Sequence, residues 1–79
     1  MTTHRRGAPD DLRVALGLFS RASAAFDALS EARRVALIAW IEGATPGRER
    51  ADRVAEIAVR ANAGDLADLA AEPRIRPPD

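Results

Sequence analysis

Apolar residues recur along most of the chain at the three- and four-residue spacing of an amphipathic helix. The two aspartates after Pro9 predict a helix start, because aspartate is a favoured N-cap, and this first helix is predicted over residues 10–19. Ser20 and Ser30 are the predicted caps of a second and a third helix. The apolar stripes of these helices are Leu12, Ala15, Leu16 and Phe19, then Ala22, Ala25, Phe26 and Leu29, and finally Leu37, Ile38, Trp40, Ile41 and Ala44.

The second half of the chain predicts one long helix and one short one. Gly43 fits the end of the third helix, because glycine is favoured just past a helix C-terminus. Thr45 followed by Pro46 predicts the next start, with proline at the first helical position, and Gly64 ends that helix. The apolar positions are Val54, Ile57, Ala58 and Ala61 in the long helix, and Leu66 and Leu69 in a short turn that ends at Pro73.

No strand pattern or internal repeat competes with these helices. The sequence therefore predicts an all-α fold, a small bundle of four helices with a short fifth helix. One domain is expected over residues 9–71, with a disordered N-terminal tail over residues 1–8 and a C-terminal tail over residues 72–79. The predicted core consists of Leu12, Leu16, Phe26, Leu29, Leu37, Trp40, Ile41, Val54 and Ile57.

The composition limits which disulfides, metal sites and catalytic groups this domain can contain. The 79 residues contain no cysteine, which excludes a disulfide framework and a thiolate zinc site. His4 is the only histidine and lies in the predicted tail, so no metal or cofactor is predicted. The domain offers no cysteine, lysine, tyrosine or histidine for catalysis, and its carboxylates have the pattern of solvated helix faces with arginine neighbours. A non-enzymatic protein is expected.

Membrane insertion is not expected from the apolar runs. The longest run, VALIAWI, has seven residues, which is far short of a membrane-spanning helix. The first twelve residues pass into a proline and two aspartates where a signal peptide would have its apolar region. A cytoplasmic location is therefore expected.

Arginines gather after the turn at Pro46, at a helix start where the macrodipole favours anions. In one interpretation they are structural and pair with acids one turn away, while the Arg50 stem lies on the apolar stripe with its head near a carboxylate such as Glu42. In the other, they bind an anion or a nucleic acid, although the zero net charge disfavours nucleic acid. The expected pairs are Arg48 with Asp52, Glu49 with Arg53, and Glu56 with Arg60, and the candidate anion-binding residues are Arg33, Arg34, Arg48, Arg50 and Arg53.

The far side of the third helix carries a second apolar stripe. A helix that is apolar on both sides should be buried on both, so this stripe predicts a contact surface for a second copy or for a protein partner of unknown identity. The alternative is that small alanines on a surface have no role. The candidate interface residues are Phe19, Ala32, Val35, Ala36 and Ala39. A homodimer would also support a core that contains few large apolar residues.

Four segments follow one another in a recognisable order: PDDLRVAL, AAFDALSEARR, AWIEGA and RADRV. Their order and spacing, from about Pro9 to Gly64, resemble the helical domain of the YdeI/OmpD-associated family, also called bacteriocin-protection proteins. The resemblance implies a helical fold and an association with envelope or antimicrobial-peptide stress, but no defined reaction. The basic start of the fourth helix is diluted here, because Thr45, Glu49 and Asp52 stand where the family pattern has lysine, threonine and arginine.

The resemblance also implies roles for individual positions. Most of the matching residues correspond to structural positions of the family, and two arginines correspond to its basic helix start. The structural positions are Pro9, Asp11, Leu12, Leu16, Phe26, Leu29, Trp40, Ile41 and Ala44, and the two arginines are Arg50 and Arg53.

Overall fold

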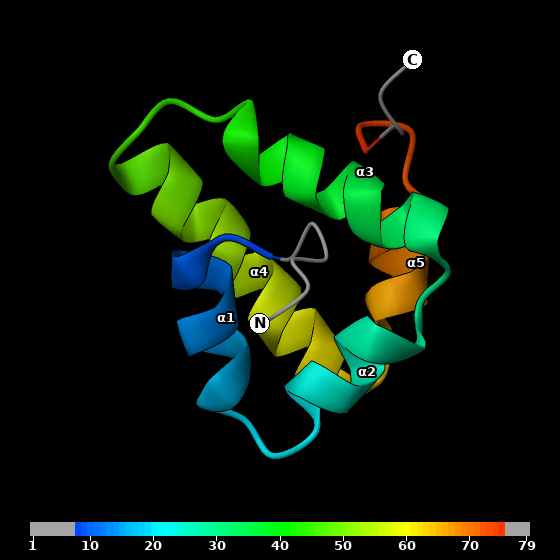
Figure 1. The fold of residues 1–79 in the computed structure, drawn as a ribbon. Coiled ribbons are helices and arrows are strands. Elements are labelled where there is room, and N and C mark those ends of the chain that lie inside the picture. The colour runs from blue at the N-terminus through cyan, green and yellow to red at the C-terminus, as the bar shows by residue number, and fades with distance from the viewer. Residues whose placement is uncertain (1–7, 76–79) are drawn as a thin grey trace, which may run out of the picture.

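The computed structural model describes residues 8–75. The described part contains five helices and no strand, which confirms the predicted all-α class with four helices and a short fifth (Figure 1). Predictions made for residues 1–7 and 76–79, including that on His4, lie outside the described residues. The helices are α1 (Asp10–Gly17), α2 (Ala22–Ala28), α3 (Glu31–Glu42), α4 (Arg48–Ala63) and α5 (Leu66–Ala70).

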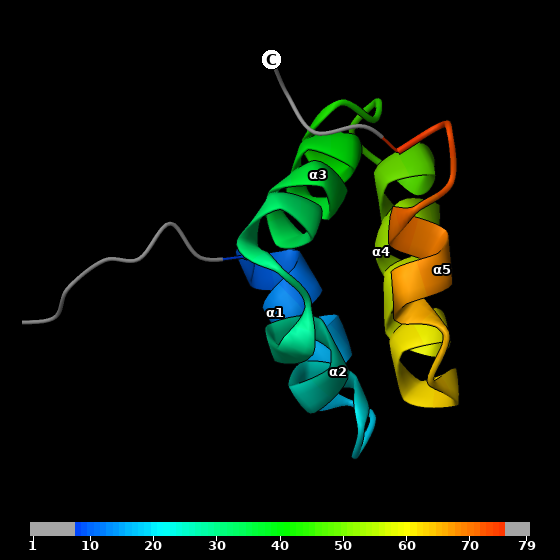
Figure 2. The same cartoon turned by 90° about the vertical axis from the view of Figure 1, so that its right-hand side faces the viewer.

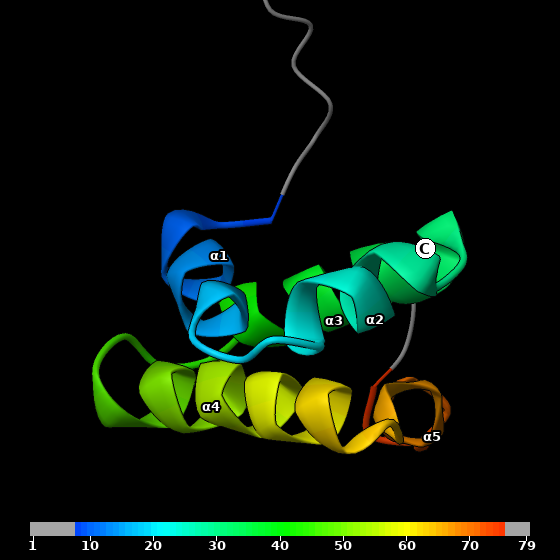
Figure 3. The ribbon, with the colours of Figure 1, turned by 90° about the horizontal axis from the view of Figure 1, so that it is seen from below.

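The helices form two layers around one core. The longest helix, α4, packs against each of the other four, and α5 lies beside it. Figure 2 and Figure 3 show α4 and α5 in one layer and α1, α2 and α3 in the other. Among residues 8–75, no helix is long and apolar enough to cross a membrane.

Local signals explain some helix ends, but the predicted caps of the first two helices are wrong. The N-caps of α1 and α2 are Pro9 and Arg21, and neither the aspartates after Pro9 nor Ser20 makes a side-chain cap hydrogen bond. The Ser30 hydroxyl accepts a hydrogen bond from the backbone N–H of Arg33 at 3.3 Å, as an N-cap does. Gly64 adopts the left-handed conformation, with φ of 87°, and ends α4. The first helix ends at Gly17 and not at residue 19 as predicted. The backbone N–H groups of Leu18 and Phe19 donate to the carbonyls three residues earlier, as in a 3₁₀ turn, and not four residues earlier as in an α-helix.

The predicted start of α4 is two residues too early. Pro46 lies in the turn, and α4 begins at Arg48 with Gly47 as its N-cap. Gly47 has φ of 106° and ψ of −129°, a backbone conformation that only glycine adopts readily. Because these backbone angles are not helical, the helix cannot extend back through Gly47 to Pro46.

The core lies between the two layers and receives side chains from all five helices. Eight of the nine residues predicted for it are buried, with Leu12, Leu37, Ile41 and Ile57 completely inaccessible. The ninth, Trp40, is only partly buried and packs against the edge of the core.

The chain beyond α5 also contributes to this core. Ile75 is only 4% exposed and packs with the buried residues, although the sequence places it in a tail that begins at residue 72. The packed part of the chain therefore reaches Ile75, the last described residue.

Candidate functional site

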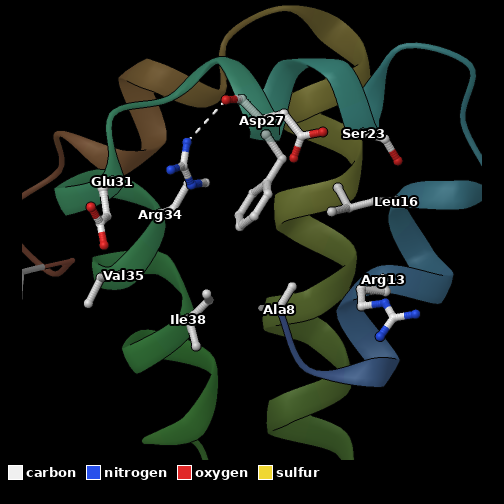
Figure 4. Close-up of a pocket in the computed structure, with 10 residues that line it drawn as sticks. Ala8, Arg13, Leu16, Ser23, Asp27, Glu31, Arg34, Val35 and Ile38 are labelled. Atoms are coloured by element: carbon white, nitrogen blue, oxygen red, sulfur yellow. Dashed lines mark hydrogen bonds between the residues drawn. The ribbon is translucent and has the colours of Figure 1, made fainter. Parts of the chain in front are cut away.

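A groove of about 890 Å³ opens between α1, α2 and α3 (Figure 4). Its apolar lining includes Leu16, Phe26 and Ile38, which also belong to the core. These side chains are at most 9% exposed, so the floor of the groove is the outer surface of the core. Ala8 and Val35 extend the apolar lining, and the polar lining consists of Arg13, Ser23, Asp27, Glu31 and Arg34.

The corner between α2 and α3 shapes one wall of this groove. α2 ends at Ala28, and Leu29 has extended backbone angles that turn the chain into α3. The Arg34 side chain fixes the corner, because its Nη1 donates to the Asp27 carbonyl at 3.1 Å and to the Leu29 carbonyl. Carbonyls at a helix C-terminus lack helical partners and favour a cation, so Arg34 caps α2.

Two carboxylates on the groove have no partner among residues 8–75. Neither the Asp27 side chain nor the Glu31 side chain takes part in an ion pair or hydrogen bond there. Asp27 also lies in the last turn of α2, where the macrodipole disfavours negative charge. Glu42 and Asp68 are likewise unpaired within the described part, but they do not line the groove.

The head of Arg50 meets a carboxylate as predicted, but the carboxylate that it pairs with is Asp11 and not the example named, Glu42. Arg50 Nε donates to Asp11 Oδ2 at 2.7 Å, and Arg50 Nη2 donates to Asp11 Oδ1 at 3.2 Å. These hydrogen bonds lower the pKa of the Asp11 carboxyl and raise that of the Arg50 guanidinium. Glu42 acts on Arg50 only through its charge at longer range.

The pairs predicted along α4 are present. Arg53 Nη2 donates to Glu49 at 2.7 Å, and Arg48 lies 4.0 Å from Asp52 in an exposed pair. Glu49 also accepts a hydrogen bond from the Thr45 backbone N–H at 3.2 Å, and hydrogen bonding to Thr45 is the main reason its pKa is lowered. All three arginines at the start of α4 are therefore engaged by carboxylates.

The structure does not bring the five candidate anion-binding arginines together. Arg33 and Arg34 lie at the start of α3, whereas Arg48, Arg50 and Arg53 follow its end, and a helix of 12 residues is about 18 Å long. Arg34 is held by backbone carbonyls. No single anion site is formed by the set.

A second charged cluster, at the end of the chain, was not predicted. Arg60 pairs with Glu56 as expected, and also with Asp65 at 3.0 Å and Glu72 at 3.5 Å. Arg74 pairs with Glu56 and Glu72, each at 2.7 Å. The Arg74 hydrogen bond is the main cause of the lowered pKa of Glu72. This cluster ties the segment after α5 to α4.

Trp40, at the side of the core, is in contact with two guanidinium groups. The Arg53 and Arg74 guanidinium carbons are 5.1 and 5.0 Å from its ring centroid, within the range of a cation–π contact. Arg53 Nη1 also donates to the Trp40 carbonyl at 2.5 Å. The partly buried Trp40 ring is therefore held at the surface by contacts with the two arginines.

The predicted interface residues do not form one exposed face. Ala36 is 2% exposed and belongs to the core, so its assignment to a contact surface is wrong. α3 contacts both α4 and α5, and this packing buries a wider arc of the helix than the sequence predicted. Ala32 is exposed, Val35 and Ala39 are half-buried, and Phe19 packs against the core from the turn after α1.

Of that set, only Val35 lines the groove. Sequence reasoning missed the polar rim residues Arg13, Asp27 and Glu31, since nothing local distinguishes them from other solvated charges. Among residues 8–75, no group of histidine, cysteine, aspartate and glutamate side chains has an arrangement that would hold a metal ion.

Comparison with known proteins gives one match. The model of the family described as bacteriocin-protection, YdeI or OmpD-associated matches residues 7–64. This range contains α1 to α4 and every residue that lines the groove, whereas α5 and the segment with Arg74 lie beyond it. No curated protein and no solved structure matches the chain.

Proposed function

The chain belongs to the bacteriocin-protection, YdeI or OmpD-associated family, and from this premise we propose that it is a non-enzymatic protein-interaction module. The observation that carries the proposal is the groove between α1, α2 and α3. It has an apolar floor, a polar rim and a volume of about 890 Å³. Grooves of this kind accept apolar side chains from an extended or helical segment of a partner.

Two parts of the groove would contact a partner: its apolar floor and its charged walls. Leu16, Phe26 and Ile38 provide the apolar floor, where burial of a partner's side chain yields about 25 cal/mol for each Å² removed from water. Arg13 and Glu31 stand on opposite walls of the groove, and Arg13 pairs with Asp10 at 3.4 Å in an exposed contact. Their charges would orient the bound segment. Val35 lies at the edge and would contact the partner beside the floor.

The arginines favour this proposal over anion binding. Those at the start of α4 are already paired with carboxylates, and Arg34 is held by carbonyls of the α2–α3 corner. An added anion would have to displace these partners. We therefore assign Arg34, Arg50 and Arg53 to stabilisation of the fold, and the groove to function.

The cellular setting of the proposal comes from the family description. From the family name we propose a role in envelope or antimicrobial-peptide stress. The proposed cytoplasmic location comes from the sequence alone, which has no long apolar run. A second copy of the chain is the simplest partner to test.

The first experiment is sedimentation velocity over a wide concentration range at low and high salt. A dimer through the groove should be almost insensitive to salt, because its contact is largely apolar. Val35→Asp should dissociate it, whereas Val59→Asp, at a 55% exposed position of α4 away from the groove, should not. Circular dichroism of both variants verifies that the helices remain.

A chain that stays monomeric is then used as immobilised bait. Proteins that bind the wild type and Val59→Asp but not Val35→Asp would support a partner in the groove. An identical set of bound proteins for all three chains would overturn the assignment of the groove.

A further inference from the structure

The surface formed by α3 and α4 holds a guanidinium group of the chain itself. Arg74, in the segment after α5, donates from Nη2 to Glu56 Oε2 of α4 at 2.7 Å. Its guanidinium carbon also lies 5.0 Å from the ring centroid of Trp40 on α3. An aromatic face attracts a planar cation, and a carboxylate binds it through charge-assisted hydrogen bonds. Trp40 and Glu56 therefore form a site that accepts an arginine side chain.

Contacts that do not involve Arg74 hold the two parts of this site in place. The Arg53 guanidinium carbon lies 5.1 Å from the Trp40 ring centroid, and Arg53 Nη1 donates to the Trp40 carbonyl at 2.5 Å. Arg60 pairs with Glu56 at 3.4 Å. The site should therefore keep its form when the Arg74 side chain leaves it, which is a condition for the binding of another arginine.

The Arg74 side chain can leave the site while the segment that carries it stays packed. This side chain is 49% exposed, and its carboxylate partners Glu56 and Glu72 are each 33% exposed, so water competes for both ion pairs. The neighbouring Ile75 is buried and packs in the core, which anchors the segment independently of the Arg74 side chain. Exchange of one guanidinium group for another therefore requires only a side-chain movement.

The site also opens into a surface hollow of about 550 Å³, which has room for the residues beside a bound arginine. No residue of this hollow lines the groove between α1, α2 and α3, so the two surfaces are separate. The hollow is lined by Trp40, Arg48, Glu49, Asp52, Arg53, Glu56 and Arg74.

We propose that the Trp40–Glu56 site binds an arginine side chain of a partner protein, and that Arg74 is the occupant which this arginine replaces. The partner's guanidinium group would lie against the Trp40 ring and on the Glu56 carboxylate, in the position that the Arg74 guanidinium takes here. Arginine fits this site better than lysine, because its planar group covers an aromatic ring while it donates to a carboxylate. Arg74 lies beyond residues 7–64, the range that the family model matches, whereas Trp40 and Glu56 lie within it.

Titration of the full-length chain with an arginine peptide tests the site. The probe is acetyl-Gly-Arg-Gly-amide, and the readout is the indole N–H signal of the single tryptophan in the NMR spectrum. Arg74→Ala empties the site, so the peptide should shift this signal in a saturable way. The wild-type chain should need several-fold more peptide for the same shift, because Arg74 fills the site in part of the molecules.

Charge-matched variants separate a defined site from a general attraction between charges. Arg74→Ala combined with Glu56→Gln should abolish the shift. Arg74→Ala combined with Asp68→Asn removes an exposed acid that does not line the hollow, and this variant should keep the shift. The corresponding lysine peptide should bind several-fold more weakly than the arginine peptide. Circular dichroism of each variant verifies that the helices remain.

A folded Arg74→Ala chain that shows no saturable shift would overturn the proposal. Equal binding of the lysine peptide, or equal binding by the variant with Glu56→Gln, would also overturn it, because general charge attraction would then explain the shift. If Arg74→Ala is unfolded, the wild-type titration decides, and a shift that a glutamine peptide produces equally well contradicts the site. The Val35→Asp test of the groove involves none of these residues, so the two proposals fail separately.

Discussion

Arg50 at the start of α4 donates two hydrogen bonds to the carboxylate of Asp11 at the start of α1, at 2.7 and 3.2 Å. The two residues are 39 positions apart, so the pair joins two helices that local sequence does not connect. An arginine at the positive end of a helix is unfavourable by itself. Here a two-point hydrogen-bonded contact with an aspartate from the neighbouring helix offsets that cost.

A double-mutant cycle measures this contact. Asp11→Asn and Arg50→Gln should each lower the free energy of unfolding, and the double variant should lose less than the two losses added together. Urea unfolding followed by circular dichroism gives the four values. The pair Arg48 and Asp52, 4.0 Å apart and exposed, is the control and should show no coupling. Additive losses at Asp11 and Arg50 would contradict the contact.

Stability should fall in acid for a reason that three carboxyl groups share. Hydrogen bonds from Arg50, Thr45 and Arg74 are the main cause of the lowered pKa values of Asp11, Glu49 and Glu72, respectively, from the usual 3.8 for aspartate and 4.5 for glutamate. The unfolded chain therefore takes up protons first as the pH falls. The stabilisation is complete above the unfolded pKa values and is lost as the pH falls through the lower folded values.

The urea midpoint should therefore be constant above about pH 5.5 and should decrease below it, since the carboxyl groups of the unfolded chain begin to protonate there. A chain with Asp11→Asn, Glu49→Gln and Glu72→Gln should start from a lower midpoint and show a shallower decrease. An unchanged decrease in this variant would assign the acid sensitivity to other groups.

The segment after α5 should be part of the folding unit. A chain that ends at Ala71 loses the buried Ile75 side chain and should be less stable by about 1.5–3 kcal/mol. It also loses the Arg74 contact with Trp40, so the fluorescence of this single tryptophan should shift to longer wavelength. A chain that ends at Ile75 is the control and should retain both properties. Equal stability of the two chains would place the boundary at residue 71 after all.

Local signals explain what the sequence could predict. Ser30 caps α3 and Gly64 ends α4 through bonds within a few residues, so their roles were evident without the tertiary structure. Pro46 misled the prediction because its preference for a helix start is overridden by the turn at Gly47. The core stripes were predictable for the same reason as the caps, since helical spacing alone selects them.

The groove could not be predicted in this way. Its floor consists of stripe residues such as Phe26 and Ile38, and only the angles between α1, α2 and α3 leave them facing an opening. The partner of Arg50 and the surface position of Trp40 likewise depend on contacts between distant segments. Ala36 was misassigned because the helix spacing does not reveal that α5 also packs on α3.

Two glycines should respond in opposite directions to substitution by alanine. Gly47 has φ of 106°, where an L side chain is strained, so Gly47→Ala should cost about 1–3 kcal/mol of stability although no atom would contact its Cβ within 4 Å. Gly17 is the last helical residue of α1 and is also surrounded by open space. Gly17→Ala should therefore stabilise the protein by about 0.4–1 kcal/mol, because alanine has less freedom to lose on folding. Thermal unfolding of the two variants beside the wild type measures both effects, and equal shifts would show that backbone conformation is not the cause.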